Sequence, residues 1–204
     1  MRSLSEYFYD VYSNAICDYH VYDGVDRELA NPYATGSIGH MGYAKNWIDT
    51  VQWHLEDLIR YPQIEPRKAL QIKKRIDQLN QKRTDTVELI DDYFHQQYSA
   101  VPCEPNARHN TQSLGWALDR LSILALKEYH IDVELARQDA TAAHIANCTN
   151  RKNILLAQKN DLLQSINWLA EDLAQGKKVV KVYRQLKMYN DVSFNPVLYG
   201  KQAH

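Results

Sequence analysis

Residues 116–175 read WALDRLSILALKEYHIDVELARQDATAAHIANCTNRKNILLAQKNDLLQSINWLAEDLAQ and contain neither glycine nor proline. A single straight helix of this length would span ~90 Å, whereas a compact chain of this size has a radius of gyration of only ~17 Å. The segment must therefore bend. The best place is residues 137–141, where Asp139 or Thr141 can cap a new helix. The sequence thus predicts two long helices that pack antiparallel.

The ends of this helical pair carry further signals. Asn110 and Thr111 stand where the first helix would be capped. Gly176 is suited to end the second helix, because glycine readily takes the left-handed conformation that follows a helix. Lys177 and Lys178 come directly after it, close to the negative end of the helix dipole.

Glycine and proline are scarce, with 7 and 6 residues among 204, and they cluster at segment boundaries. This scarcity argues against sandwiches, barrels and doubly wound sheets, which need frequent turns. Apolar residues at intervals of three and four predict amphipathic helices over residues 1–23, 43–61 and 66–100. Residues 177–190 have weaker helical spacing, so a short helix is favoured there and a strand is the alternative.

These elements together predict an all-α fold. We expect a single-domain antiparallel helical bundle over residues 1–204, with about five long helices. No internal repeat divides the chain. Residues 195–200 are expected to form an ordered, irregular C-terminal tail.

Composition and charge argue against several classes of protein. Lysine and arginine number 24 and aspartate and glutamate 25, so the chain lacks the basic excess of a nucleic-acid-binding domain. No apolar run approaches the ~20 residues of a membrane span. The three cysteines form no CxxC pair, which suits a reducing compartment. We therefore expect a cytoplasmic protein with no nucleic-acid partner, no membrane span and no cofactor.

Several polar side chains interrupt the apolar faces of the predicted helices. They are His54 and Asp57 in the second helix, Asn80 and Arg83 in the third, and Asp119 and Lys127 in the fourth. A buried charge without a partner costs several kcal/mol, on the order of 3–5. Such groups must therefore meet one another or a ligand. Two interpretations stay open: a structural network that ties the helices together, and a ligand pocket between them.

If there is a pocket, its charge favours an anion. Arg83 and Lys127 supply positive charge, and Arg184 and Lys187 belong to a basic stripe further along the chain. Guanidinium and ammonium groups suit phosphate or carboxylate, although a solvated basic face is the better explanation of the stripe. In this hypothesis Asn80, Arg83, Asp119, Lys127, Arg184 and Lys187 bind the ligand. His54 and Asp57 would form the catalytic acid–base pair.

Other sites are disfavoured. The histidines are scattered singly and no Glu-x-x-His occurs, so we predict no metal site. Gly36, Gly39 and Gly42 are spaced Gly-x-x-Gly-x-x-Gly, but no strand precedes them, and a closely packed loop at a helix N-terminus is the better interpretation. No nucleophile motif is present.

Five motifs resemble a bacterial family, the domain of unknown function 4254. They are WHLED at 53–57, LNQKRTD at 79–85, LDRLSILALKEYH at 118–130, KVYRQLKMYND at 181–191 and NPVLYG at 195–200. The resemblance implies a compact, mostly helical bacterial protein and supplies no activity, so it assigns no catalytic residue. It also implies an association with glycosyltransferases of cell-envelope polysaccharides, which is not a mechanism.

Two functions remain in competition. The first is a non-enzymatic structural or partner-binding module, which forms a homo-oligomer. The absence of a catalytic motif and the tyrosine-rich first helix motivate it. The alternative is an enzyme or binding protein for an anionic small molecule, such as a sugar phosphate or nucleotide sugar. Whether the protein is an enzyme stays open.

Overall fold

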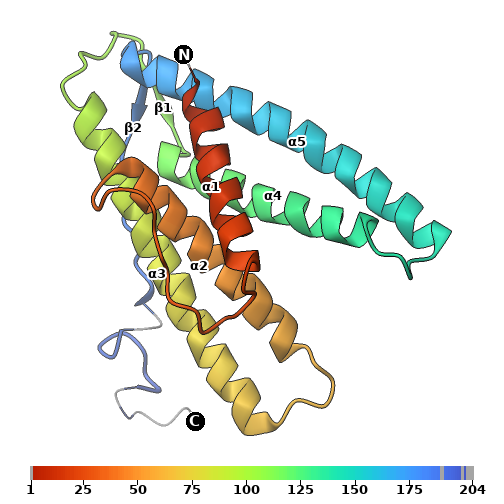
Figure 1. The fold of residues 1–204 in the computed structure, drawn as a ribbon. Coiled ribbons are helices and arrows are strands. Elements are labelled where there is room, and N and C mark those ends of the chain that lie inside the picture. Colours follow the sequence, from red (N-terminus) through yellow and green to blue (C-terminus); the bar gives the residue numbers. More distant parts are fainter. Residues whose placement is uncertain (1, 189–190, 199, 201–204) are drawn as a thin grey trace.

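The chain is described by a computed structural model that covers residues 2–188, 191–198 and 200. Within these residues the elements are α1 (Leu4–His20), α2 (Ile38–Ile59), α3 (Pro66–Tyr98), β1 (Arg108–Asn110), α4 (Leu114–Leu135), α5 (Ala142–Ala174) and β2 (Lys178–Val180). The predicted all-α class is confirmed (Figure 1). Among the described residues, no helix is long and apolar enough to cross a membrane.

The predicted bend in the long segment is confirmed. Helix α4 ends at Leu135 and α5 begins at Ala142. Of the two candidate caps, Thr141 performs the role, because its side chain accepts a hydrogen bond from the backbone N–H of His144. Gly176 follows the end of α5 with a φ of 69°, the left-handed conformation expected of it.

Two predicted helix starts were wrong. Ser113 caps α4, and not Asn110 or Thr111, since its side chain accepts from the backbone N–H of Trp116. Helix α2 begins at residue 38 and not at 43, so Gly39 lies inside the helix and not in a loop. A Cβ atom on Gly39 would lie 2.3 Å from the hydroxyl of a tyrosine on α1. The glycine therefore permits close packing of α1 on α2 and does not break the helix.

One hydrophobic core draws on all five helices. Helices α2 and α3 lie side by side, α5 folds back along α4, and α1 packs against α2, α4 and α5 (Figure 1). Tyr12, Tyr19 and Tyr43 are among the largest fully buried side chains of this core. Part of the tyrosine excess therefore serves core packing, with the apolar body of each ring buried between helices.

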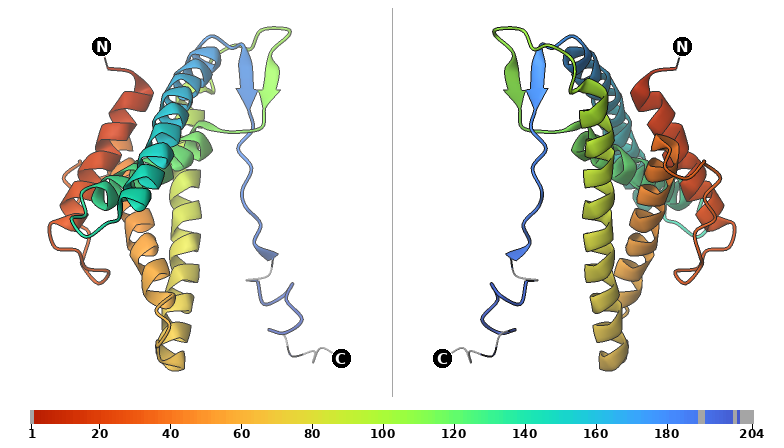
Figure 2. Two further views of the ribbon diagram at one scale, coloured as in Figure 1. Left: turned by 90° about the vertical axis from the view of Figure 1, so that its right-hand side faces the viewer. Right: turned by 90° about the vertical axis from the view of Figure 1, so that its left-hand side faces the viewer.

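Over residues 177–188, the described part of 177–190, the predicted short helix was wrong. β2 pairs with β1 in parallel, with Lys178 opposite Arg108, and residues 181–187 have no regular structure. Gly176 ends α5, and the β-branched side chains of Val179 and Val180 that follow it suit a strand. The two strands and the chain after them lie on the side of α3 away from α1 (Figure 2).

The two C-terminal motifs lie largely within this irregular segment. Residues 191–198 contain turns and no helix or strand, in line with the expected irregular tail. Tyr189, Asn190 and Tyr199 of these motifs lie outside the described residues. The same holds for Met1 and 201–204 of the expected single domain.

Candidate functional site

A lysine lies fully buried in the middle of the helix bundle. Lys45 on α2 is 0% exposed. Its Nζ contacts the carboxylate of Asp49 one turn along α2 and lies 2.8 Å from Oδ1 of Asp119 on α4. It also donates to the backbone carbonyl of Asp119 at 3.2 Å. All three donor positions of the ammonium group can therefore be satisfied inside the protein.

Arg83 on α3 completes this arrangement. Its Nε and Nη2 donate to the two oxygens of Asp119 at 2.8 and 2.6 Å, a bidentate pair. Nε also lies 3.5 Å from Oδ1 of Asp49. We call Lys45, Asp49, Arg83 and Asp119 the four-charge cluster. Its two cations and two carboxylates balance, and it joins α2, α3 and α4.

Neutral groups extend the cluster further into the core. Ser122 on α4 donates from Oγ to Asp49 at 2.6 Å and accepts from the side-chain amide of Asn46 at 2.9 Å. Thr50 donates to the backbone carbonyl of Asn46. Asn46, Thr50 and Ser122 are each 0% exposed. A buried polar network with few open positions is rigid and favours one packing of the helices.

Burial and charge act in opposite directions on the two carboxylates. Burial raises the pKa of Asp49, although Lys45 and Ser122 act against it. Burial also acts to raise the pKa of Asp119, but Lys45 and Arg83 outweigh it and the net shift is downward. The hydrogen bonds to Asp119 raise the pKa of Arg83. Asp119 is thus the ionised centre to which both cations bind.

Arg83 also reaches the surface, where its side chain is 28% exposed. It lines a hollow beside the tail together with Asn80 and Lys187. It lines a second hollow with Asp119 and Lys127, between α3, α4 and α5. The structure therefore brings four of the other predicted ligand-binding residues, Asn80, Asp119, Lys127 and Lys187, to the surroundings of Arg83.

The basic residues of the tail are engaged with α3. Lys187 donates from Nζ to the hydroxyl of Thr84 at 3.0 Å and to the backbone carbonyl of Asn80 at 3.3 Å. Arg184 donates to Asp92 at 2.7 Å. Arg184 therefore lies on carboxylates of α3 and is not aimed into the hollows around Arg83.

The predicted acid–base pair lies elsewhere. The ion-pair contact of His54 is with Asp23, 3.7 Å from its Nε2, and not with Asp57. Burial lowers the pKa of His54. His54 and Asp57 line a common hollow near the end of α1, and Asp57 also lines one with Arg83. The sequence predicted one site for His54 and Arg83. In the structure His54 lies near the end of α1 and not in the hollows around Arg83.

The comparison with known families covers this region. A family model described as a protein of unknown function, DUF4254, matches residues 40–182. The chain belongs to the DUF4254 family. No curated protein and no solved structure matches it. The matched range contains the whole four-charge cluster, whereas Arg184 and Lys187 lie beyond its end.

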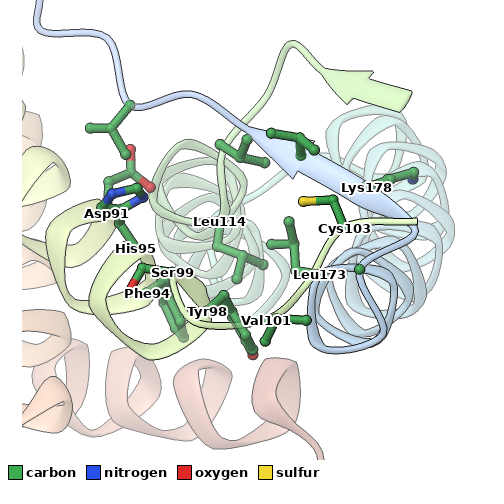
Figure 3. A pocket seen from close by; sticks show the side chains of 14 residues that line it. Asp91, Phe94, His95, Tyr98, Ser99, Val101, Cys103, Leu114, Leu173 and Lys178 are labelled. Carbon is green, nitrogen blue, oxygen red and sulfur yellow. The ribbon is translucent and has the colours of Figure 1, made fainter. Parts of the chain in front are cut away.

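A further cavity lies inside the DUF4254 range. It is lined by residues from the end of α3, from β2 and from the ends of α4 and α5, including Asp91, Tyr98 and Leu173 (Figure 3). Its volume is about 170 Å³, which is below the ~300–1,000 Å³ of small-molecule sites. We interpret it as a packing gap beneath β2. None of the residues predicted for the site lines it.

Sequence reasoning missed two members of the four-charge cluster in this DUF4254 chain. Neither Lys45 nor Asp49 is among the residues predicted for the site from the sequence. Their spacing of four residues was the available signal, because it places a cation and a carboxylate on the same side of a helix. Only the packing of α4 on α2 shows that this side is buried.

Proposed function

We propose that this DUF4254 protein is a non-enzymatic partner-binding module that self-associates through its C-terminal segment, residues 181–188 and 191–198. The supporting observation is the exposure of large apolar side chains there. Those at least half exposed are Tyr183, Leu186, Met188, Val192, Phe194, Val197 and Leu198. A concentration of exposed large apolar side chains in one segment is typical of a binding site.

The first part of the segment has its polar groups turned inward. Arg184 pairs with Asp92 at 2.7 Å, and the backbone N–H of Gln185 donates to Glu88 at 2.9 Å. On either side of these two anchors, Tyr183 and Leu186 are 74% and 84% exposed. In an isolated chain, polar side chains normally face the solvent and large apolar side chains are buried. The polar contacts hold the segment on α3 so that its apolar side chains face outward, where a partner can cover them.

A second copy of the chain is the occupant that we favour. Two copies supply the same apolar segment to a twofold interface, in which each segment can pack on the other. Seven large side chains offer surface on the order of the ~800 Å² that each partner of a stable interface contributes. The formal net charge of −1 gives two copies little reason to repel each other.

The test is the mass of the full chain by size-exclusion chromatography with light scattering over a range of concentrations. We expect a dimer. Tyr183→Ser combined with Leu186→Ser should raise its dissociation constant at least ~100-fold, because two large apolar contacts are lost from each copy. The control, Leu70→Ser with Ile154→Ser, changes side chains that are 57% and 59% exposed outside the segment and should leave the dimer intact. A strict monomer, or a dimer insensitive to the first pair, contradicts the proposal.

A second candidate function is the binding of an anionic small molecule. The observation that favours it is the hollow of about 590 Å³ between α3, α4 and α5, whose lining contains three cations, Arg83, Arg120 and Lys127, and two carboxylates, Asp119 and Asp161. Within the described part of the chain, neither Arg120 nor Lys127 forms an ion pair. Two cations without an ion-pair partner, next to the guanidinium of Arg83, suit a phosphate ester.

Thermal-shift measurements with sugar phosphates and nucleotide sugars test this second function. A ligand at a hundredfold its dissociation constant adds ~2.7 kcal/mol, which raises the unfolding midpoint by several degrees. Lys127→Met should abolish the shift, whereas Lys82→Met, at an exposed position of α3 outside the hollow, should retain it. No shift with any of these compounds, or a shift unaffected by Lys127→Met, argues against an anion site in this hollow.

A further inference from the structure

Three histidines from three different helices meet at one end of the bundle. His20 lies at the end of α1, His54 on α2 and His130 on α4. One ring nitrogen of each lies within 4.8 Å of those of the other two. The Nε2 atoms of His20 and His54 are 3.1 Å apart. Residues 20, 54 and 130 are distant in the sequence, so the fold alone creates this group.

The hydrogen bonding of His20 leaves a lone pair in the group. Its Nδ1 lies 2.7 Å from the backbone carbonyl of Ile16. A carbonyl can only accept, so Nδ1 carries the proton, and the lone pair on Nε2 of His20 accepts from Nε2–H of His54 when no metal is bound. A backbone carbonyl bound to the distal nitrogen is also the common support of a metal-binding histidine, because it fixes the tautomer and the ring orientation.

His130 supplies an unpaired nitrogen. Its Nε2 is buried and forms no hydrogen bond within the described residues. Its ring lies flat against Trp53, with centroids 4.5 Å apart and an angle of 5° between the planes. A buried polar atom without a partner is costly. Its presence beside two other imidazoles points to a bound species that lies between them.

Aromatic rings hold the other two imidazoles in place. His54 stacks on Tyr19 with centroids 5.2 Å apart, and His20 packs against Tyr129 at 4.2 Å. The rings can turn little without disturbing their neighbours, so a ligand set would be preorganised. Such an arrangement lowers the cost of bringing three side chains to one ion.

The group has an acidic neighbour and access to solvent. Asp23 has a φ of 47°, and its carboxylate lies 3.7 Å from Nε2 of His54. Both residues line the open hollow near the end of α1. An oxygen of Asp23 or a water molecule from the hollow can therefore supply a further ligand without a rearrangement of the core.

The distances match a tetrahedral transition-metal ion. Two nitrogens that bind one Zn²⁺ at ~2.0–2.1 Å lie ~3.3 Å from each other, close to the 3.1 Å between His20 and His54. Imidazole nitrogens select zinc, copper or nickel over magnesium and calcium, which prefer oxygen. Three histidines with one open position correspond to an accessible zinc site and not to a closed structural one.

We propose that His20, His54 and His130 form a binding site for a divalent transition-metal ion of the zinc class, with its open position facing the hollow that Asp23 lines. The site shares no residue with the C-terminal segment or with the four-charge cluster. It therefore stands independently of the function proposed above, and each can fail without the other.

The test is calorimetric titration of Zn²⁺ into the full chain after removal of metal by a chelator. We expect one ion per chain. His130→Phe keeps a ring against Trp53 but has no ligand atom. Loss of a residue that merely supports a ligand costs ~10–100-fold, so loss of a ligand should weaken binding at least ~100-fold. The control is His144→Phe. It removes a histidine that is not part of the group and whose side-chain contacts are with Glu134 and Cys148. It should leave the affinity unchanged.

A second readout covers the case in which His130→Phe does not fold. Cobalt(II) added to the unmodified chain should give visible bands of a tetrahedral ion without a thiolate charge-transfer band, because the ligands are nitrogen and oxygen. Equal affinity of wild type and folded His130→Phe, the absence of a one-to-one site, or a thiolate band would each overturn the proposal.

Discussion

Replacing Lys45 by methionine is expected to lower the free energy of unfolding by about 3–5 kcal/mol. Methionine fills nearly the same space, so little packing is lost. The cost comes from the charges left behind. Asp49 and Asp119 would remain buried with only Arg83 to neutralise them, and the fully buried position of Lys45 admits no water to take its place. Urea denaturation followed by circular dichroism measures the change.

Two further variants separate charge from shape. Lys45→Met with Asp49→Asn removes one charge of each sign and leaves the bidentate pair of Arg83 and Asp119 intact. It should therefore recover part of the stability lost in the single variant. Arg83→Met removes a cation that is 28% exposed, where water can compensate in part, so it should cost less than Lys45→Met. If Lys45→Met costs under ~1 kcal/mol, the cluster does not stabilise the fold.

Much of the fold followed from the sequence because its breaks carry local signals. The capping side chain of Thr141 indicates the bend after Leu135, and Gly176 indicates the end of α5. Such signals act within a turn of helix and need no tertiary information. The start of α2 did not follow, because Gly39 was judged by its local preference alone. Its role is decided by a contact with α1, which no local signal reports.

The segment after Gly176 failed for a related reason. Val180 belongs to β2, where it pairs with Asn110 of β1, a residue 70 positions earlier in the chain. A three-residue strand is too short to give a periodic pattern. The helical spacing of Val179, Val182, Tyr183 and Leu186 was therefore the stronger local signal, although pairing at a distance determined the strand.

The sequence predicted two of the four residues of the four-charge cluster. Interrupted apolar faces singled out Arg83 and Asp119, which do meet, because a charge on a buried face must find a partner. The apolar rhythm also placed His54 on the core, but Leu55 takes that position and is 1% exposed. A shift of one residue turns a helical side chain by about 100°. His54 consequently faces His20 and His130, and not Arg83.

The other large effect is expected at the start of α4, where Asp91→Ala should cost about 3 kcal/mol. Asp91 on α3 is 5% exposed. Its two oxygens accept from the hydroxyl of Ser113 at 2.6 Å and from the backbone N–H of Gly115 at 2.7 Å. Alanine would leave both donors buried without a partner, at ~1–3 kcal/mol each. Thermal and urea denaturation measure the loss.

Asp91→Asn and Asp92→Ala isolate the cause of this loss. Asparagine keeps an oxygen for the N–H of Gly115, and the hydroxyl of Ser113 can turn to accept from its amide, so most of the stability should return. Burial raises the pKa of Asp91 because it disfavours the charged carboxylate, so the loss of that charge should add little to the cost. Asp92 is the neighbouring carboxylate, but its side chain is 38% exposed and pairs with Arg184 on the surface. Its removal should cost under ~1 kcal/mol. Equal losses for Asp91→Ala and Asp92→Ala would mean that α4 does not depend on this contact with α3.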